Sequence, residues 1–431
     1  MTLSEVCELL DQTNLLTAVQ QYSRQQHEPD WLLALREKAV AAYARLPLPK
    51  FEKINYADWP LEDFTQPTEQ VSAEPSADLG AGQQFYSVGD TTMQLSLPTE
   101  AIEQGVILSD LRSAIQTHGD LVQRYLMQKA LQLGNDKLTA LNTALMTNGF
   151  FLYVPANVVL KAPIEMTQYV DSRQSQNFFN HSLVIAAENS RVQVIQRLKT
   201  LGAGAAAVHL LVEVIAEADA TVDFAGIDAL SANTTAYLNR RGVLGPDARL
   251  NWELAEMNAG RVVADFDTEL KGRGSEAQVK TIAIATGQQT QGIDTRVTNY
   301  GQKTTANIIQ RGIILDAAAL IFNGIGHIVK GAHGAKADQE NRLLMLSSKA
   351  RGDADPILLI DENDVEAGHA ASVGRVDEQQ MTYLLSRGIP KPVAERLVIR
   401  GFLAGVITEL RSQRLRTELN SLIERRLTDE H

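Results

Sequence analysis

The chain has 431 residues, which is more than one ordinary domain of about 100–200 residues and predicts two or three structural units. A hydrophobic fraction of 44% and a charged fraction of 21% are typical of globular proteins, so a disordered, collagen-like or coiled-coil protein is excluded for most of the chain. Forty basic residues against 52 acidic ones give a net charge of −12, which disfavours binding to nucleic acid.

The sequence carries no pattern expected of a secreted or membrane protein. Its single cysteine, Cys7, excludes an internal disulfide framework and a multi-cysteine metal site, and fits a reducing compartment. The first residues are acidic where a signal peptide needs basic ones. The longest uncharged stretch, residues 138–160, contains three asparagines and Pro155, a poor pattern for a membrane span. We therefore expect a soluble cytoplasmic protein without membrane contact.

The N-terminal part has helical periodicity. Apolar residues recur at helical spacing near the start, and a second helix is predicted from Asp30 until Pro47 and Pro49 end it. Residues 66–84 contain few large apolar residues and predict a flexible surface loop. Helical periodicity then returns over residues 109–146. Residues 1–148 are thus expected to form a mostly helical domain.

Residues 149–362 contain short β-branched runs separated by Gly, Asn and Asp. Within them, a small residue that begins a predicted strand recurs in steps of 30, 28, 29 and 29 residues. These markers are Ser190, Ala220, Ala248, Ala277 and Ala306. A fixed period built from short strands is typical of a solenoid. We predict a mainly β fold with a right-handed parallel β-helix core; an antiparallel sandwich with evenly spaced hairpins is the alternative.

The last part of the chain, residues 363–431, is predicted to be a helical domain. Asp377 suits the N-cap of a first helix and Gly388 the position just after its end. Pro392 suits the first turn of a second helix, which is expected to continue to about residue 415. Its broad apolar face is expected to contain Leu397, Phe402, Leu403, Val406, Ile407 and Leu410.

Enzyme motifs are scarce. Phosphate-binding, dinucleotide-binding, zinc-protease and nucleophile-elbow motifs are all missing from the sequence. A β-helix leaves open a carbohydrate lyase or hydrolase that uses paired carboxylates, for which the repeat region offers Asp219, Asp223, Asp247 and Asp265. Two of these occupy predicted turns, where aspartate commonly bonds the local backbone. His327 and His333 would share one face if both lay on a strand, a weak indication of metal binding.

The C-terminal third carries four motifs in a fixed order. Residues 338–347 read DQENRLLMLS, 356–360 read PILLI, 364–374 read DVEAGHAASVG, and 377–389 read DEQQMTYLLSRGI. Together they resemble the SufB/SufD family of iron–sulfur cluster assembly proteins. The N-terminal runs PDWL at 29–32 and LPLP at 46–49 are similar to the family's opening, so the resemblance spans nearly the whole chain.

The resemblance implies the SufD branch of this family. The cysteine that SufB carries near its histidine motif falls at Ala367, so this chain lacks the thiolate that iron–sulfur clusters ordinarily require. The resemblance implies a non-catalytic subunit that pairs with a SufB-like subunit, with a homodimer as an alternative when the chain is isolated. It also implies that the C-terminal helices dock a SufC-like ABC ATPase. The candidate docking contacts are Tyr383, Arg387, Gly388, Phe402 and Leu403.

His369 matches the histidine of the family motif. Imidazole is a sound iron ligand, so the resemblance implies that His369 contacts iron or a nascent cluster at the SufB interface. The alternative is that it only donates a hydrogen bond across that interface. No cofactor is expected to bind firmly to this chain alone. An iron–sulfur cluster is expected at the complex interface, and the resemblance allows a flavin in the complex, although the sequence contains no flavin motif.

Overall fold

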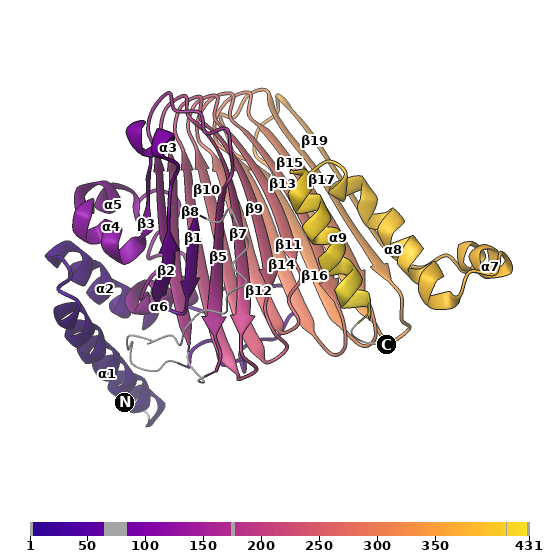
Figure 1. Cartoon of the computed structure of the whole chain (residues 1–431), viewed down its shortest axis with the longest axis horizontal. Coiled ribbons are helices and arrows are strands. Elements are labelled where there is room, and N and C mark those ends of the chain that lie inside the picture. Colours follow the sequence, from indigo (N-terminus) through magenta and orange to yellow (C-terminus); the bar gives the residue numbers. More distant parts are fainter. Residues whose placement is uncertain (1–2, 64–83, 174–176, 411, 429–431) are drawn as a thin grey trace.

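The core of the protein is a parallel β-solenoid of about eight turns, flanked by helices (Figure 1). The computed structural model describes residues 3–63, 84–173, 177–410 and 412–428, with side chains from residue 14 onward. The mainly β fold with a parallel β-helix core is therefore confirmed, and the antiparallel sandwich is excluded. Apart from Gln84, the predicted loop over residues 66–84 lies outside the described residues. Within the described ranges, none of the helices combines the length and apolarity needed to cross a membrane.

Two long sheets face each other across the solenoid. Sheet A has the strand order β2-β1-β5-β7-β9-β11-β13-β15-β17-β19, and all its neighbours are parallel except β1 and β2. Its strands are β1 (Phe85–Val88), β2 (Thr91–Leu95), β5 (Ile164–Asp171), β7 (Arg191–Leu201), β9 (Thr221–Ala229), β11 (Arg249–Glu256), β13 (Glu276–Ala285), β15 (Thr305–Ile314), β17 (Ala335–Met345) and β19 (Val365–Arg375).

Sheet B has the order β3-β4-β6-β8-β10-β12-β14-β16-β18, and only β3 and β4 are antiparallel. Its strands are β3 (Ile107–Asp110), β4 (Phe150–Val154), β6 (Phe178–Ala186), β8 (Ala206–Ala216), β10 (Thr234–Leu244), β12 (Arg261–Leu270), β14 (Thr290–Asn299), β16 (Ala319–Ile328) and β18 (Arg351–Ile360). The chain alternates between the sheets, so each coil adds one strand to both.

The main core lies between the two sheets. Inward side chains at paired positions stack into continuous apolar columns, such as Val192, Val222 and Leu250. At its N-terminal end this core is closed by residues that precede the regular coils. They include Phe85 of β1 and Ala101 of the short helix α3 (Thr99–Glu103). The β-branched runs of the sequence form strands because their side chains fill these columns.

Six successive coils enter sheet A, at strands β7 to β17, through one corner residue in the left-handed backbone conformation, with φ between 54° and 73°. These corner residues are Asn189, Asp219, Asp247, Gly274, Lys303 and Gly334. Asn, Asp and Gly tolerate this conformation better than other residues. A small buried residue follows each of them: Ser190, Ala220, Ala248, Ser275, Thr304 and Ala335. The polar turn and small residue that mark the sequence repeat therefore form this corner.

The register corrects the predicted repeat after its third marker. Ala248 is followed at the corner by Ser275, because Arg249 pairs with Glu276. Ala277 pairs instead with Leu250, two residues further along the strand, and Ala306 pairs with Ala277. The five markers thus lie on two neighbouring columns of sheet A. From β13 onward, alanine also occupies the first inward-facing position of the strand. A small residue in the sequence therefore does not show whether that position is the corner or the strand that follows it.

N-terminal helices cover the outer face of sheet B. They are α1 (Leu3–Gln25), α2 (Asp30–Tyr43), α4 (Leu111–Thr117), α5 (Gly119–Tyr125) and α6 (Lys137–Leu145). They pack apolar residues against strands β6, β8, β10 and β12. Residues 51–61, which follow α2, lie on the same face: Leu61 O contacts His209 Nε2 at 2.9 Å, and a Cβ added at Gly292 would lie 1.9 Å from the side chain of Ile54. Because β1, β2 and β3 lie within residues 1–148, that part is less helical than predicted.

C-terminal helices cover the outer face of sheet A. They are α8 (Lys391–Ile407) and α9 (Gln413–Thr428), whose apolar faces pack on Ile195, Ile227 and Ile282, among others. The second predicted helix therefore ends at Ile407 instead of about residue 415, and Leu397 is 45% exposed instead of sharing the buried face. Strand β19 extends the solenoid beyond residue 362, so the helical part begins at α7 (Glu378–Ser386), which projects from the body with no buried residue (Figure 1).

Candidate functional site

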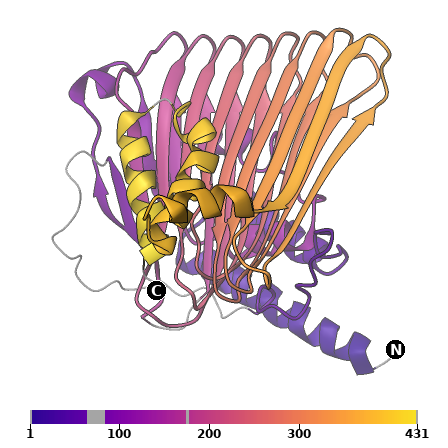
Figure 2. The same cartoon turned by 90° about the vertical axis from the view of Figure 1, so that its right-hand side faces the viewer.

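The C-terminal end of the solenoid is open. Strands β19 and β18 end sheets A and B, and each has one edge without a neighbouring strand among the described residues. Figure 2 views the molecule from this side. Apolar side chains are exposed here: Ile357, Leu359, Ile360 and Val373 are 36–45% exposed. The open end thus presents free backbone groups together with apolar side chains, which is the composition of a surface that another chain covers.

His369 lies in the inward-facing row of the last strand. Its register partner on β17 is Gln339, which is 4% exposed, whereas His369 is exposed because no further coil covers it. The same holds for Val373, whose partner Leu343 belongs to the main core. Within the described part of the chain, the imidazole of His369 makes no hydrogen bond or ion pair. Its imidazole is therefore available to a partner at the open end.

The chain offers only an incomplete metal site at this end. Ala367 stands where the family resemblance expects the SufB cysteine, and it lies two residues from His369 in the same inward row. Among the described residues, no group of three or more His, Cys, Asp or Glu side chains could hold a metal ion. An imidazole such as that of His369 can supply one nitrogen ligand to iron.

His327 and His333 do not share a strand face. His327 is in β16, 3.3 Å from Asp361, whereas His333 lies in the following turn, 3.5 Å from Glu362. Glu362 accepts hydrogen bonds from the backbone N–H groups of Gly331 and Asn363, which lower its pKa to about 2. The contacts of Glu362 with Gly331 and His333 attach the corner between β18 and β19 to the previous coil. The weak indication of a metal site at the two histidines is therefore not supported by their geometry.

The proposed ATPase contacts fall into two groups. Tyr383 is 58% exposed on α7, with the Arg387 guanidinium 5.1 Å from its ring centre, and Gly388 ends the helix with φ of 80°. Asp377 caps α7 by accepting a hydrogen bond from Gln379 N, as predicted. By contrast, Leu403 is fully buried between α8, α9 and sheet A, and Phe402 packs against the same cluster. Leu403 presents no surface to a partner, because the apolar face of α8 is used to cover the sheet.

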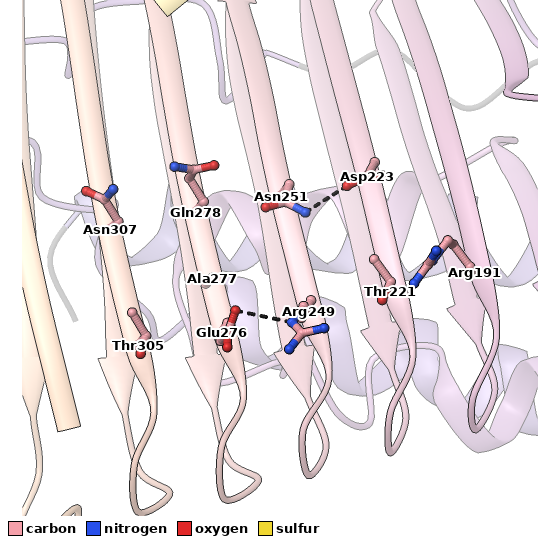
Figure 3. Close-up of a pocket in the computed structure, with 10 residues that line it drawn as sticks. All are labelled: Arg191, Thr221, Asp223, Arg249, Asn251, Glu276, Ala277, Gln278, Thr305 and Asn307. Atoms are coloured by element: carbon pink, nitrogen blue, oxygen red, sulfur yellow. Dashed lines mark hydrogen bonds and ion pairs between the residues drawn. The ribbon is translucent and has the colours of Figure 1, made fainter. Parts of the chain in front are cut away.

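A groove of about 610 Å³ lies on the outer face of sheet A and is lined mainly by polar side chains of successive strands (Figure 3). Its carboxylates are paired: Asp223 accepts from Asn251 at 2.7 Å, and Glu276 lies 3.2 Å from Arg249. Asp265 is on the opposite sheet and bonds Arg241. Since Asp219 and Asp247 are corner residues, the four aspartates do not converge on one site. The geometry therefore gives no support to a paired-carboxylate enzyme.

These features define a parallel β-solenoid protein with an open apolar end and helices on both outer faces. A family profile described as the SufBD core domain of the SUF iron–sulfur cluster assembly system matches residues 169–402, and a SufBD N-terminal profile matches residues 79–166. The iron–sulfur cluster assembly protein SufD of Bacillus subtilis strain 168 is 40% identical over 421 residues, 94% of this chain and 96% of that protein. The chain belongs to the SufB/SufD family, and it is a SufD-like iron–sulfur cluster assembly protein.

More distant relatives cover the same span. Iron–sulfur cluster assembly SufBD family proteins of Staphylococcus saprophyticus and of Staphylococcus aureus strain MRSA252 are 24% and 25% identical to this chain. Each match covers 94% of this chain and 91% of the relative. The similarity therefore includes the open end as well as the rest of the solenoid.

Sequence reasoning did not find the other residues of the open end. Ile360 and Val373 continue apolar core columns, and Gln339 and Asn341 are buried amides one coil below the surface. The alternation of β17 places Gln339 and Asn341 on the inward face together with Ala337 and Leu343. That alternation could have identified the inward-facing residues from the sequence. It identifies residues near the open end only once β19 is known to be the last strand.

Proposed function

We propose that the chain is a non-catalytic scaffold subunit of an iron–sulfur cluster assembly complex and that it pairs through its open end with a SufB-like subunit. The observation that carries the proposal is the exposed inward row of β19, in which core positions such as His369 and Val373 lack a covering coil. A partner with a similar open solenoid would cover the inward-facing side chains of β18 and β19 and the free edges of these two strands. In isolation, a second copy of this chain could occupy the same surface and form a homodimer.

His369 is proposed to hold iron or the nascent cluster, which is cargo of the complex. Its neutral imidazole supplies one nitrogen ligand, while the partner supplies thiolates that this chain lacks at Ala367. Thiolate ligands suit a reducing compartment such as the cytoplasm. A partner that covers the open end would also exclude water from around His369, and this would strengthen its interaction with a cation.

The test of this role is a His369→Ala variant in the purified complex. We expect assembly to be retained, because one contact at the edge of a large interface rarely decides its stability. Iron and acid-labile sulfide per complex should fall, since one ligand is lost. Normal iron and sulfide would reject the ligand role, and loss of assembly would show that His369 is an interface hydrogen-bonding residue instead.

The exposed face of α7 is proposed to dock a SufC-like ATPase. No residue of this helix is buried in the chain, and Tyr383 and Arg387 form an exposed aromatic and cationic pair on it. Reversing the charge with Arg387→Glu should weaken pull-down of the ATPase at unchanged melting temperature. Arg273→Glu, at an exposed arginine of the turn between β12 and β13, is a matched control. Unchanged ATPase binding by Arg387→Glu would reject the role of this residue.

A further inference from the structure

Three charged side chains are buried together inside the solenoid. Asp228 of β9, Arg240 of β10 and Glu256 of β11 are fully buried and face the interior between the two sheets. On the inward faces of strands β8 to β14, which are described throughout, no other charged residue occurs. These three residues, the interior charge cluster, therefore have to balance their charges among themselves, because a buried charge without a partner is costly.

Arg240 is placed to neutralise one carboxylate. Its Nη1 and Nη2 bind the two oxygens of Asp228 at 2.8 and 2.9 Å, whereas its Nη1 lies 3.7 Å from Glu256 Oε1, beyond hydrogen-bond distance. Nη2 also donates to Gln196 Oε1 at 3.3 Å, which belongs to a neutral amide. A guanidinium stays charged in proteins but carries a single positive charge. With both carboxyl groups ionised, the cluster would thus keep one negative charge without compensation.

Glu256 has the surroundings of a protonated carboxyl group. Its carboxyl lies within hydrogen-bond reach of that of Asp228, its register partner on β9, yet Glu256 Oε1 has no donor among the described residues. Two carboxyl groups can share a hydrogen bond only when one of them carries a proton. Glu256 Oε2 accepts from Asn258 Nδ2 at 2.9 Å, which leaves Oε1 for the proton. Burial raises the pKa of Glu256 well above its usual 4.5, and the charge of Asp228 raises it further, against the opposite effect of Arg240.

Within the described residues, no further charge enters this part of the interior. On β13 the register partner of Glu256 is Ala283, and on β12 the ring of Phe266 lies 5.5 Å from the Arg240 guanidinium. Arg426 of α9 approaches from the outer face of sheet A and donates to the backbone oxygen of Asn258 at 2.7 Å. A proton is therefore the species that can bring the interior charge cluster to neutrality.

We propose that Glu256 is a proton-binding site of the solenoid: at neutral pH its Oε1 carries a proton and donates a hydrogen bond to Asp228, which stays the ionised partner of Arg240. The cluster then joins sheet A to sheet B without net charge. Because a glutamate of the unfolded chain is ionised at neutral pH, the chain takes up one proton at this site when it folds. This inference does not depend on the proposed function.

Infrared spectroscopy of the isolated full chain at about pH 7 tests the proton directly, because a protonated carboxyl group has a carbonyl band that an ionised carboxylate lacks. We expect this band in the wild type, a shift of the band when glutamate carries carbon-13 at its side-chain carboxyl, and its loss in Glu256→Gln. Glu276→Gln is the matched control, since Glu276 is 48% exposed and lies 3.2 Å from Arg249. It should leave the band unchanged.

Three spectroscopic outcomes would overturn the proposal. A wild-type spectrum without a band that responds to labelled glutamate would do so even if every variant fails to fold. A carbonyl band that does not shift with the label would place the proton on an aspartate. A shifted band that survives in folded Glu256→Gln would assign the proton to another glutamate.

The pH dependence of stability gives a second, independent measurement. Above about pH 4.5 the unfolded chain releases the proton of Glu256 while the folded chain keeps it, so raising the pH favours the unfolded wild type. From about pH 5.5 to 7, the folding equilibrium constant of Glu256→Gln relative to wild type should therefore rise about tenfold per pH unit. Urea unfolding measures this ratio, and Glu276→Gln should show no such rise. A constant ratio for Glu256→Gln would contradict proton uptake at this site.

Discussion

Glu362 ties the last corner of the solenoid to the coil before it. Its side chain is 3% exposed, it accepts the N–H of Gly331 at 2.9 Å, and Lys330 and His333 lie 3.5 Å away. The backbone hydrogen bonds favour the ionised carboxylate and lower its pKa from the usual 4.5 to about 2. The corner that positions β19, and with it His369, thus depends on one charged side chain.

This dependence predicts a pH effect on stability. Because the folded pKa lies below the unfolded one, the stabilisation is complete above about pH 5 and is lost as the pH falls toward 2. The difference in urea midpoint between wild type and Glu362→Gln should therefore be constant from about pH 7 to 5 and smaller at about pH 3. Glu366→Gln, at a side chain 74% exposed, is the control and should change little. A difference that stays constant or grows on acidification would contradict this assignment.

At the scale of the element, α9 is held on sheet A by ion pairs as well as by its apolar face. Arg197 of β7, with its side chain 4% exposed, lies 2.8 Å from Glu418 of α9 and 2.9 Å from Glu165 of β5. Arg414 of α9 also reaches Glu165 at 2.7 Å. Two charged groups from two strands thus meet two charged groups of the helix at one place, which fixes where α9 lies along the sheet.

Removing Glu418 should loosen this attachment. We expect Glu418→Ala to lower the free energy of unfolding by about 1–3 kcal/mol, because buried Arg197 loses a charged hydrogen-bond acceptor. The exposed pair between Arg249 and Glu276 provides a control, since Glu276→Ala should cost less than about 1 kcal/mol. Urea unfolding monitored by circular dichroism compares the two. Equal losses would indicate that burial of the α9 apolar face, not the ion pair, holds the helix.

Local sequence patterns predicted the type of each element better than its contacts. A small residue after a polar turn predicted the coils, because each corner needs a turn residue and a small buried residue. Ala277 is also small and follows a polar turn, but it lies in the strand, at the register position of Leu250. Asp377, Gly388 and Pro392 predicted helix ends correctly, since capping is local. Leu403 was assigned to a partner because the sequence does not distinguish an apolar face that packs on its own sheet from one that packs on another chain.

For the whole molecule, the open end depends on where the stack of coils stops. His369 could be found by resemblance, but the exposure of Ile360 and Val373 follows from β18 and β19 being the last strands. The same side chains one coil earlier would be core residues. A local pattern cannot reveal this, because inward-facing residues have the same alternation whether or not another coil covers them.

The central claim is that this open end is the pairing surface for a SufB-like subunit, and Val373→Asp tests it most directly. Val159→Asp is the matched control, since Val159 is an exposed apolar residue remote from the open end, 53% exposed against 41% for Val373. Affinity for the SufB-like subunit is measured by sedimentation of the mixed full-length chains. The account predicts that Val373→Asp weakens pairing about tenfold or more, because a carboxylate would be buried unpaired, while Val159→Asp pairs as wild type does. Wild-type affinity of a folded Val373→Asp chain would contradict it.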